Sequence, residues 1–265
     1  MSTPKKIRLN QTFIKKLKED SICPSQIYHV FIEETAKMEI TDSQNKGRFF
    51  EELCLLQPGE TPIVQAPKLK NGSMPIDYVR ISEQAEFFRE EVTQQFGLDI
   101  KPMNRQIYME YDYAPNVVLH GKIDFNSPIK DEILGDVPMA IHDLKMTGSI
   151  FKQFGDYSWA FPYNIDHTQA FMYTFLYKEL FGWTLPFYYW VFDYSPDKNY
   201  KVFRKQVEPL HLLELQESIR MSVEKIKLFE RNGWNVTVPM EKNCKNCPLK
   251  ENCKSYNPKK SIEVI

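Results

Sequence analysis

Apolar positions recur at helical spacing in the N-terminal part of the chain. The segment 11–34 has this spacing but is interrupted by SICPS, so it predicts two short helices joined at Cys23, with Pro24 in the first turn of the second. A further helix begins in NKGRFFEELCLLQ, and SEQAEFFREEVTQQFG predicts another, with Ser82 as its N-cap and Gly97 as its C-terminal stop. The chain before residue 98 is therefore expected to be mainly helical.

The pattern changes to strand-like alternation between Arg105 and Met146. Three segments, RQIYMEYDY, NVVLHGKIDFNS and MAIHDLKMT, alternate aromatic or β-branched residues with polar ones and predict an antiparallel meander. Helical spacing returns in NIDHTQAFMYTFLYKELFG. A hairpin-like pair, LPFYYWVFDYSP and YKVFRKQVE, follows, and LHLLELQESIRMSVEKIKLFERNG predicts a long helix that ends at Gly233. This order predicts an α/β fold with one main domain.

The third predicted strand carries two charges in an apolar context. Asp143 and Lys145 are two residues apart, so in a strand they share one face while Leu144 points to the other. Burying such charges costs several kcal/mol per ion unless each is paired or bound to a metal. The strand therefore lies either at a solvated edge or at a functional site, and the triplet alone does not decide between them. The same spacing in Asp99 and Lys101 follows a helix end and predicts only a solvated pair.

A second carboxylate lies on the preceding strand. Asp124 follows Gly121, which permits a close approach of the backbone, and it is either a solvent-facing residue at a strand end or a partner of Asp143. If the two strands pair, both carboxylates can converge on one hard cation such as Mg²⁺. Lys145 would then lie beside a metal-bound water, an arrangement suited to hydrolysis of a phosphodiester.

Two helices offer further groups. Glu51 follows Gly47 by four residues in a predicted helix and can bring a third carboxylate to the same cavity, although a solvated helix position is the simpler interpretation. Gln169 and Tyr173 are four residues apart and share one helical face, where an amide and a phenol can contact a nucleotide backbone or the attacking water. A packed amphipathic helix would show the same spacing.

Composition restricts the function classes. The 265 residues have a formal net charge of -1, so no overall basic character marks a protein that coats DNA. No apolar run is long enough to cross a bilayer, and the basic N-terminal segment lacks the apolar core of a signal peptide. We expect a cytoplasmic protein without a membrane partner.

The cysteines indicate a metal site. Cys244, Cys247 and Cys253 form a Cys-x2-Cys-x5-Cys segment, which leaves a four-coordinate site one ligand short, and Cys23 is the best candidate for the fourth ligand. Cys54 lies in a helical apolar pattern and is interpreted as a small buried hydrophobe. Four thiolates suit either zinc or an iron–sulfur cluster.

The ordered motifs resemble those of RecB-type nucleases in the PD-(D/E)xK superfamily. In chain order they are Gly47-x-x-x-Glu51, Gly121-x-Ile123-Asp124, Asp143-x-Lys145 and Gln169-x-x-x-Tyr173. Many relatives carry His at the first position, although Glu occurs in the phage lambda exonuclease type. The resemblance implies a restriction-endonuclease-like core, with a central mixed sheet flanked by helices.

The resemblance also implies roles for these residues. Mg²⁺ or Mn²⁺ would be bound by Asp124 and Asp143, assisted by the Leu144 carbonyl and by Glu51. Lys145 would act on the nucleophile or on the charge of the transition state. Gln169 and Tyr173 would position the water or the DNA strand.

The expected function is that of a Mg²⁺- or Mn²⁺-dependent deoxyribonuclease, acting as an exonuclease on single-stranded DNA or DNA ends. Its partners would be DNA and proteins of recombination, replication or CRISPR adaptation. The alternative is a non-catalytic DNA-binding or complex-forming subunit that keeps the fold. Retention of the three acids together with Lys145 argues against that alternative.

The cysteine pattern is similar to that of AddB-type and CRISPR-adaptation nucleases, in which one N-terminal and three C-terminal cysteines hold a 4Fe-4S cluster. The resemblance favours this cluster over zinc at Cys23, Cys244, Cys247 and Cys253. A single nuclease domain over 1–265 is then expected, joined end to end at the cluster. Its parts are an N-terminal helical segment 1–46, a nuclease core 47–233 and a C-terminal cysteine segment 234–265.

Overall fold

The computed structural model describes residues 6–19, 22–152, 158–235, 244, 247–251 and 253. The chain divides into two compact units. The terminal unit comprises Met1–Ile40, Asp112–Leu119 and Leu213–Ile265, and the central unit comprises Thr41–Tyr111 and His120–Leu212. No helix in the described part of the chain is both long enough and apolar enough to cross a membrane.

The terminal unit contains the first strand and the short helices after it. Its elements are β1 (Ile7–Leu9), α1 (Gln11–Lys18), α2 (Pro24–Ile27), the π-helical turn η1 (Tyr28–Ile32) and α7 (Pro209–Arg231) from Leu213 onward. The three residues of β1 pair in parallel with the first three residues of β3 (Val117–Asp131). No strand was expected at β1, because three residues are too few to show a period.

Helix α1 begins where its capping residue requires. The Asn10 side chain accepts a hydrogen bond from the Phe13 amide at 2.9 Å and satisfies one of the free donors of the first turn. Phe13, Ile14 and Leu17 are buried, and the Phe13 ring stacks on Phe31 at 4.5 Å. The two short helices that the interrupted pattern predicts are thus present on either side of Cys23.

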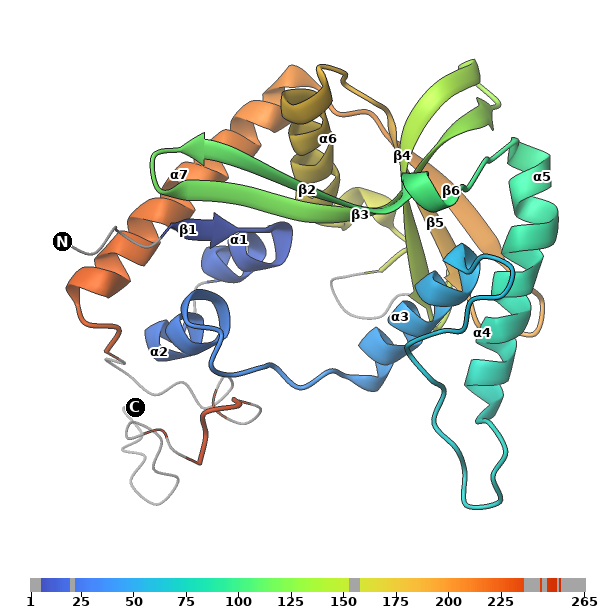
Figure 1. The fold of residues 1–265 in the computed structure, drawn as a ribbon, viewed down its shortest axis with the longest axis horizontal. Helices are drawn as coiled ribbons and strands as arrows, with labels where there is room; N and C mark the ends of the chain where they lie inside the picture. Colours follow the sequence, from blue (N-terminus) through green and yellow to red (C-terminus); the bar gives the residue numbers. More distant parts are fainter. Residues whose placement is uncertain are drawn as a thin grey trace. The chain divides into compact units, whose positions relative to one another are not determined.

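The central unit is an α/β layer structure (Figure 1). Its helices are α3 (Asp42–Leu55), α4 (Ile76–Phe87), η2 (Phe88–Val92), α5 (Thr93–Phe96), η3 (Pro102–Asn104), η4 (Pro162–Asn164) and α6 (Thr168–Phe181). Its strands are β2 (Arg105–Ala114), β3, β4 (Gly135–Thr147), β5 (Phe187–Asp193) and β6 (Tyr200–Lys205); the tip of the β2–β3 hairpin belongs to the terminal unit.

The sheet is mixed. Its order is β1-β3-β4-β5-β6, with β2 also paired to β3. Strands β3 and β4 are antiparallel, β4 and β5 are parallel with α6 in the connection between them, and β5 and β6 are antiparallel. A central mixed sheet flanked by helices confirms the expected fold class, a restriction-endonuclease-like core. The three-strand segment β2–β4 and the β5–β6 hairpin also lie where the alternation of the sequence predicts them.

An aromatic core joins α3 and α4 to one face of the sheet. Phe50 of α3 lies 5.1 Å from the Phe192 ring of β5, and Phe88 of η2 lies 6.1 Å from the Trp190 ring. Leu144 of β4 packs into the same cluster. Since adjacent strand residues point to opposite faces, Asp143 and Lys145 face away from this core.

One helix boundary differs from its prediction. Helix α4 begins at Ile76 after Pro75, not at Ser82, whose hydroxyl donates instead to the Tyr78 carbonyl within the helix at 3.0 Å. A serine can bond to the preceding turn as readily as it caps a helix, so its presence did not fix the start. The predicted end is confirmed, because Gly97 adopts the left-handed conformation with φ of 63°.

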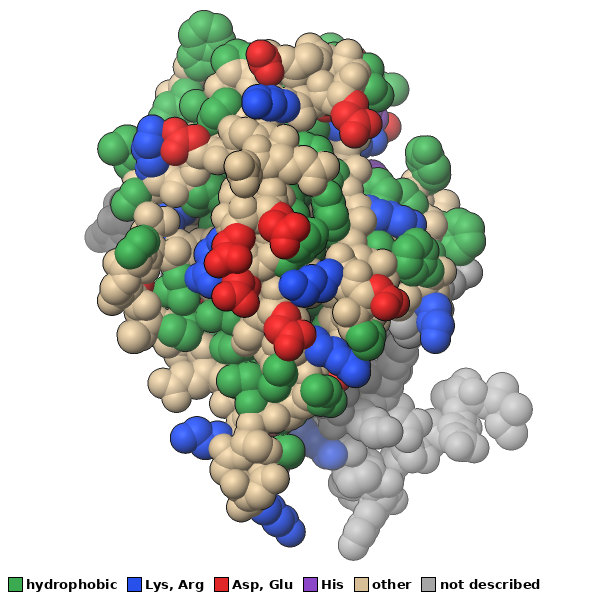
Figure 2. All heavy atoms as spheres, turned by 90° about the vertical axis from the view of Figure 1, so that its right-hand side faces the viewer, with side chains coloured by type: hydrophobic (Ala, Val, Ile, Leu, Met, Phe, Trp, Pro, Cys, Tyr) green, Lys and Arg blue, Asp and Glu red, His purple; other side chains and the backbone are tan. Residues whose placement is uncertain are grey.

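The charge on one face is mixed. Figure 2 views the side that carries α4 and α5, and its coloured acidic and basic side chains are interspersed over that face. Any binding of nucleic acid therefore depends on local groups and not on the overall charge, which is a formal net charge of -1.

Candidate active site

Asp143 and Lys145 form the centre of the candidate site. The Asp143 side chain is 1% exposed, and its Oδ2 lies 2.5 Å from Lys145 Nζ. Its Oδ1 accepts a hydrogen bond of 2.6 Å from the Gln169 amide of α6. The two-residue spacing on β4 thus places both charges on one face, while Leu144 lies in the aromatic core.

Asp124 joins this pair from the neighbouring strand. Phe125 and His142 face each other in the antiparallel β3–β4 ladder, and Asp124 and Asp143 are the adjacent residues on the two strands. Asp124 Oδ2 accepts a hydrogen bond of 2.6 Å from the Leu144 amide. Backbone pairing and this side-chain contact together fix one carboxylate beside the other.

Ionisation of Asp124 is costly in the absence of a further cation. Burial raises the pKa of Asp124 well above its usual value, and the carboxylates of Glu51 and Asp143 raise it further. The Lys145 ammonium and the Leu144 amide act in the opposite direction without cancelling the rise. The site as folded therefore favours the approach of another cation.

Glu51 comes from α3, whose start is fixed by a capping box between Thr41 and Gln44. Glu51 Oε1 accepts a hydrogen bond of 3.1 Å from the side-chain amide of Gln106. Burial raises the Glu51 pKa, Lys122 lowers it, and the Asp143 charge raises it again. Glu51 thus belongs to the same electrostatic group as the two aspartates.

Helix α6 supplies the remaining predicted residues. Besides its contact with Asp143, Gln169 hydrogen-bonds with Tyr173, whose own pKa is raised by burial and by the nearby aspartates. Gly121 of β3 lies directly against this phenol, since a Cβ atom built on Gly121 would be 2.7 Å from Tyr173 Cε1. The structure therefore brings all the predicted carboxylate, lysine, amide and phenol groups into one region.

Two residues near the site were not anticipated. Gln106 has a φ of 48°, which residues other than glycine, asparagine and aspartate rarely adopt, and nothing in its sequence context signals this conformation. His142 is fully buried on the core side of β4, where Trp190 Nε1 donates to its Nδ1 at 2.9 Å and its Nε2 lies 3.1 Å from the Ser127 carbonyl. Burial lowers the His142 pKa to about 3, so the ring is neutral and contributes to packing.

Cys54 lies in the core and is 2% exposed, as expected for a small buried hydrophobe. Cys23, Cys244, Cys247 and Cys253 are all half-buried thiols. Burial raises the Cys23 pKa, and the nearby Cys247 and Cys253 contribute to the rise.

Among the described residues, no three or more His, Cys, Asp or Glu side chains are arranged as a metal site. This holds for the carboxylates as well as for the thiols. Residues 245 and 246, between Cys244 and Cys247, and residue 252, before Cys253, lie outside the described residues. The iron–sulfur ligand set therefore stays a prediction.

Comparison with solved structures relates this arrangement to known folds. A candidate exonuclease from Eubacterium rectale superimposes with a TM-score of 0.61 over 97% of this chain and 91% of the other, at 16% sequence identity. The chain shares its fold. An alkaline exonuclease from Laribacter hongkongensis matches with a TM-score of 0.45 at 8% identity, over 85% of this chain and 93% of its own. No protein-family model and no curated protein sequence matches the chain.

Proposed function

We propose that this protein is a divalent-metal-dependent nuclease that hydrolyses phosphodiester bonds in DNA. The observation that carries the proposal is the convergence of Asp124, Asp143 and Lys145, with Gln169 bonded to Asp143 Oδ1. The fold shared with a candidate exonuclease gives independent support. A phosphodiester is anionic, and a hydrolytic site for it needs a cation, a positioned water and a cationic side chain.

The donor set fits Mg²⁺ or Mn²⁺. Asp124, Asp143 and Glu51 offer carboxylate oxygens, which hard cations prefer, and the Leu144 carbonyl is the expected fourth group. Asp143 already faces one cation, because the Lys145 ammonium lies 2.5 Å from its Oδ2. A divalent ion bound here would supply Lewis-acid stabilisation of the phosphate and lower the pKa of a bound water.

The remaining side chains act on charge and orientation. Lys145 would neutralise negative charge on the phosphate or orient the attacking water, since its side chain is only 24% exposed and its ammonium lies beside Asp143. Gln169 fixes the Asp143 carboxylate through its amide. Tyr173, held between Gln169 and Gly121, would contact the DNA strand.

The substrate we propose is single-stranded DNA or a DNA end, attacked as an exonuclease. The alternative function is that of a DNA-binding or complex-forming subunit without activity. End-labelled single- and double-stranded DNA, incubated with Mn²⁺ and with EDTA, distinguishes the two. A ladder of short products from the labelled ends would identify exonuclease action, and internal cuts in a closed circle would identify an endonuclease.

The chain contains a matched control for the active-site variants. Asp99 and Lys101 have the same spacing as Asp143 and Lys145, but their ion pair is half-exposed at 50% and 58%. Asp143→Asn and Lys145→Gln should each reduce turnover by about 100-fold or more, whereas Asp99→Asn and Lys101→Gln should leave it unchanged. Equal activity in all four variants would exclude the proposed site, and DNA binding without any cleavage by the wild type would establish the alternative.

We further propose that Cys23, Cys244, Cys247 and Cys253 bind a 4Fe-4S cluster that staples the two ends of the chain. Support comes from their spacing and from the electrostatic effect of Cys247 and Cys253 on Cys23. Four thiolates are the usual ligand set of such a cluster, and a structural zinc ion is the rival. A closed loop of this length would restrain the unfolded chain.

Purification without oxygen followed by iron, sulfide and zinc analysis tests the cluster. Cys23→Ser should remove the iron as completely as Cys247→Ser does, and Cys54→Ser should leave it in place, because Cys54 is packed in the core. Zinc without iron would refute the cluster. Full iron content in Cys23→Ser would refute the staple between the two ends.

A further inference from the structure

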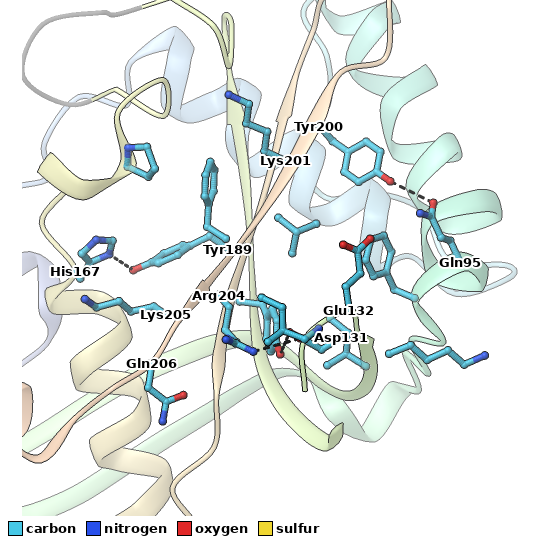
Figure 3. Close-up of a pocket in the computed structure, with 18 of the residues that line it drawn as sticks. Gln95, Asp131, Glu132, His167, Tyr189, Tyr200, Lys201, Arg204, Lys205 and Gln206 are labelled. Atoms are coloured by element: carbon cyan, nitrogen blue, oxygen red, sulfur yellow. Dashed lines mark hydrogen bonds and ion pairs between the residues drawn. The ribbon is translucent and has the colours of Figure 1, made fainter. Parts of the chain in front are cut away.

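A cavity of about 800 Å³ surrounds the edge strand β6 in the central unit (Figure 3). Strand β6 ends the sheet order, so side chains from both of its faces line this cavity. His167, Tyr189 and Lys205 lie on one side of the strand, and Tyr200, Gln95 and Glu132 lie on the other. The proposed catalytic residues are not among the lining residues.

The sheet register connects one side of this cavity to the carboxylate site. Asp143 of β4 is opposite Tyr189 of β5, and Lys145 is opposite Val191, which is in turn opposite Lys201 of β6. Residues opposite one another in a sheet point to the same face, and two strand spacings amount to about 10 Å. Lys201 therefore lies in line with Lys145 on the face that α6 covers.

This side has the groups that hold a single nucleic-acid strand. Lys201 and Lys205 extend along aromatic rings, with Nζ at 4.9 Å from the Phe151 ring centre and 5.5 Å from that of Phe171. Tyr163 is 96% exposed at the same cavity, and Tyr189 lies at its wall beside His167. Ammonium groups that follow a backbone, together with aromatic faces on which bases stack, are typical of single-strand binding.

The opposite side of β6 has a different charge balance. Arg204 is paired there with Asp131 at 3.2 Å, and the other charged residues that line this side in the described part of the chain are Glu132 and Lys130, of opposite sign. On the α6 side, the described lining residues include Lys201 and Lys205 and no carboxylate. A phosphate backbone is therefore favoured on the α6 side.

We propose that the α6 side of this cavity binds the single DNA strand next to the scissile phosphate, with Lys201 and Lys205 on its phosphates and Tyr163 stacked on a base. This inference rests on the proposed nuclease function. The bound DNA strand would run from the carboxylates toward the sheet edge at β6. The alternative occupant is a polypeptide strand that adds to the open edge of β6, and binding measurements distinguish it from DNA.

The test measures binding of a fluorescein-labelled single-stranded oligonucleotide by anisotropy in EDTA, over a range of KCl concentrations. Lys201→Gln and Lys205→Gln should each weaken binding and reduce the slope of log affinity against log salt by about 0.7, the value for one lost phosphate contact with a single strand. Tyr163→Ala should weaken binding about 5- to 150-fold with little change in slope. Lys178→Gln, at an exposed position on α6, is the matched control and should bind as the wild type does.

Lysine acetylation followed by mass spectrometry provides a second measurement on the unaltered protein. Bound DNA should protect Lys201 and Lys205 but not Lys178. Wild-type affinity and salt slope in both lysine variants, with no protection by DNA, would overturn the inference and leave the β6 edge for a polypeptide. If the wild type shows the predicted binding but cleaves no DNA with Mn²⁺, the nuclease proposal fails and the binding site stands. If the wild type cleaves DNA and these variants bind normally, only the binding site fails.

Discussion

Replacing Gly121 by alanine should destabilise the protein through one contact. The added Cβ would lie 2.7 Å from Tyr173 Cε1, a distance that real Cβ atoms essentially never show, and 3.1 Å from its Cδ1, which is tighter than most Cβ contacts. The Tyr173 ring is 6% exposed and hydrogen-bonds with Gln169, so it cannot swing into solvent without losing both packing and that bond. Overpacking of this kind costs about 1–3 kcal/mol.

For a chain of this size, that cost corresponds to a fall in melting temperature of about 2 to 12 °C. Gly47→Ala is the control, because Gly47 lies inside helix α3 and a Cβ there would meet nothing within 4 Å. In a helix interior alanine is about 0.5–1 kcal/mol better than glycine, so this variant should be as stable as the wild type or more stable.

A double-mutant cycle identifies the cause. Thermal or urea unfolding of wild type, Gly121→Ala, Tyr173→Ala and the double variant should show a coupling of about 0.5–3 kcal/mol, because the second alanine removes the ring that the first one strikes. A Gly121→Ala penalty that is unchanged in the Tyr173→Ala background would refute the contact as its source. Full stability of the single variant would refute the close approach itself.

Two further predictions concern other contacts. Burial opposes ionisation of Asp131, but four hydrogen-bond and ionic partners outweigh it and hold the pKa of this carboxyl below its usual value. Asp131→Asn should therefore cost about 1–3 kcal/mol of unfolding free energy at pH 7. In urea unfolding, this difference should vanish as the pH falls through the lowered pKa. Gln106→Gly should relieve the left-handed backbone strain and leave the melting temperature unchanged or higher. The Mn²⁺ concentration for half-maximal cleavage should rise about 10- to 100-fold in this variant, because Glu51 loses its amide partner. A lower melting temperature with unchanged Mn²⁺ dependence would contradict the second prediction.

The sequence predicted the elements that local patterns define. The two-residue period of β4 placed Asp143 and Lys145 on one face and Leu144 on the other, because strand alternation depends only on neighbouring residues. The α3 and α6 positions of Glu51 and Gln169 followed in the same way from helical spacing. Motif order then brought groups from separate elements into one expected site.

Features that depend on distant partners could not be predicted. Strand β1 is three residues long and exists through parallel pairing with Val117–Leu119, more than a hundred positions along the chain. The left-handed conformation of Gln106 has no local signal, since glycine or asparagine would be expected there. The cavity at β6 arises from loops and side chains of several elements and has no motif of its own.

The buried imidazole of His142 has a consequence for how the chain reaches its native strand alignment. Because Nδ1 accepts from Trp190 of β5, Nε2 carries the proton and donates to the Ser127 carbonyl of β3, so one ring ties three adjacent strands together. An apolar side chain would tolerate a slip of two residues, which keeps every side chain on its own face. The imidazole would lose both partners in the slipped state, at a cost of about 1–3 kcal/mol for each buried group left unsatisfied. During folding, His142 therefore selects the one alignment in which the carboxylates of the two neighbouring strands come to lie side by side.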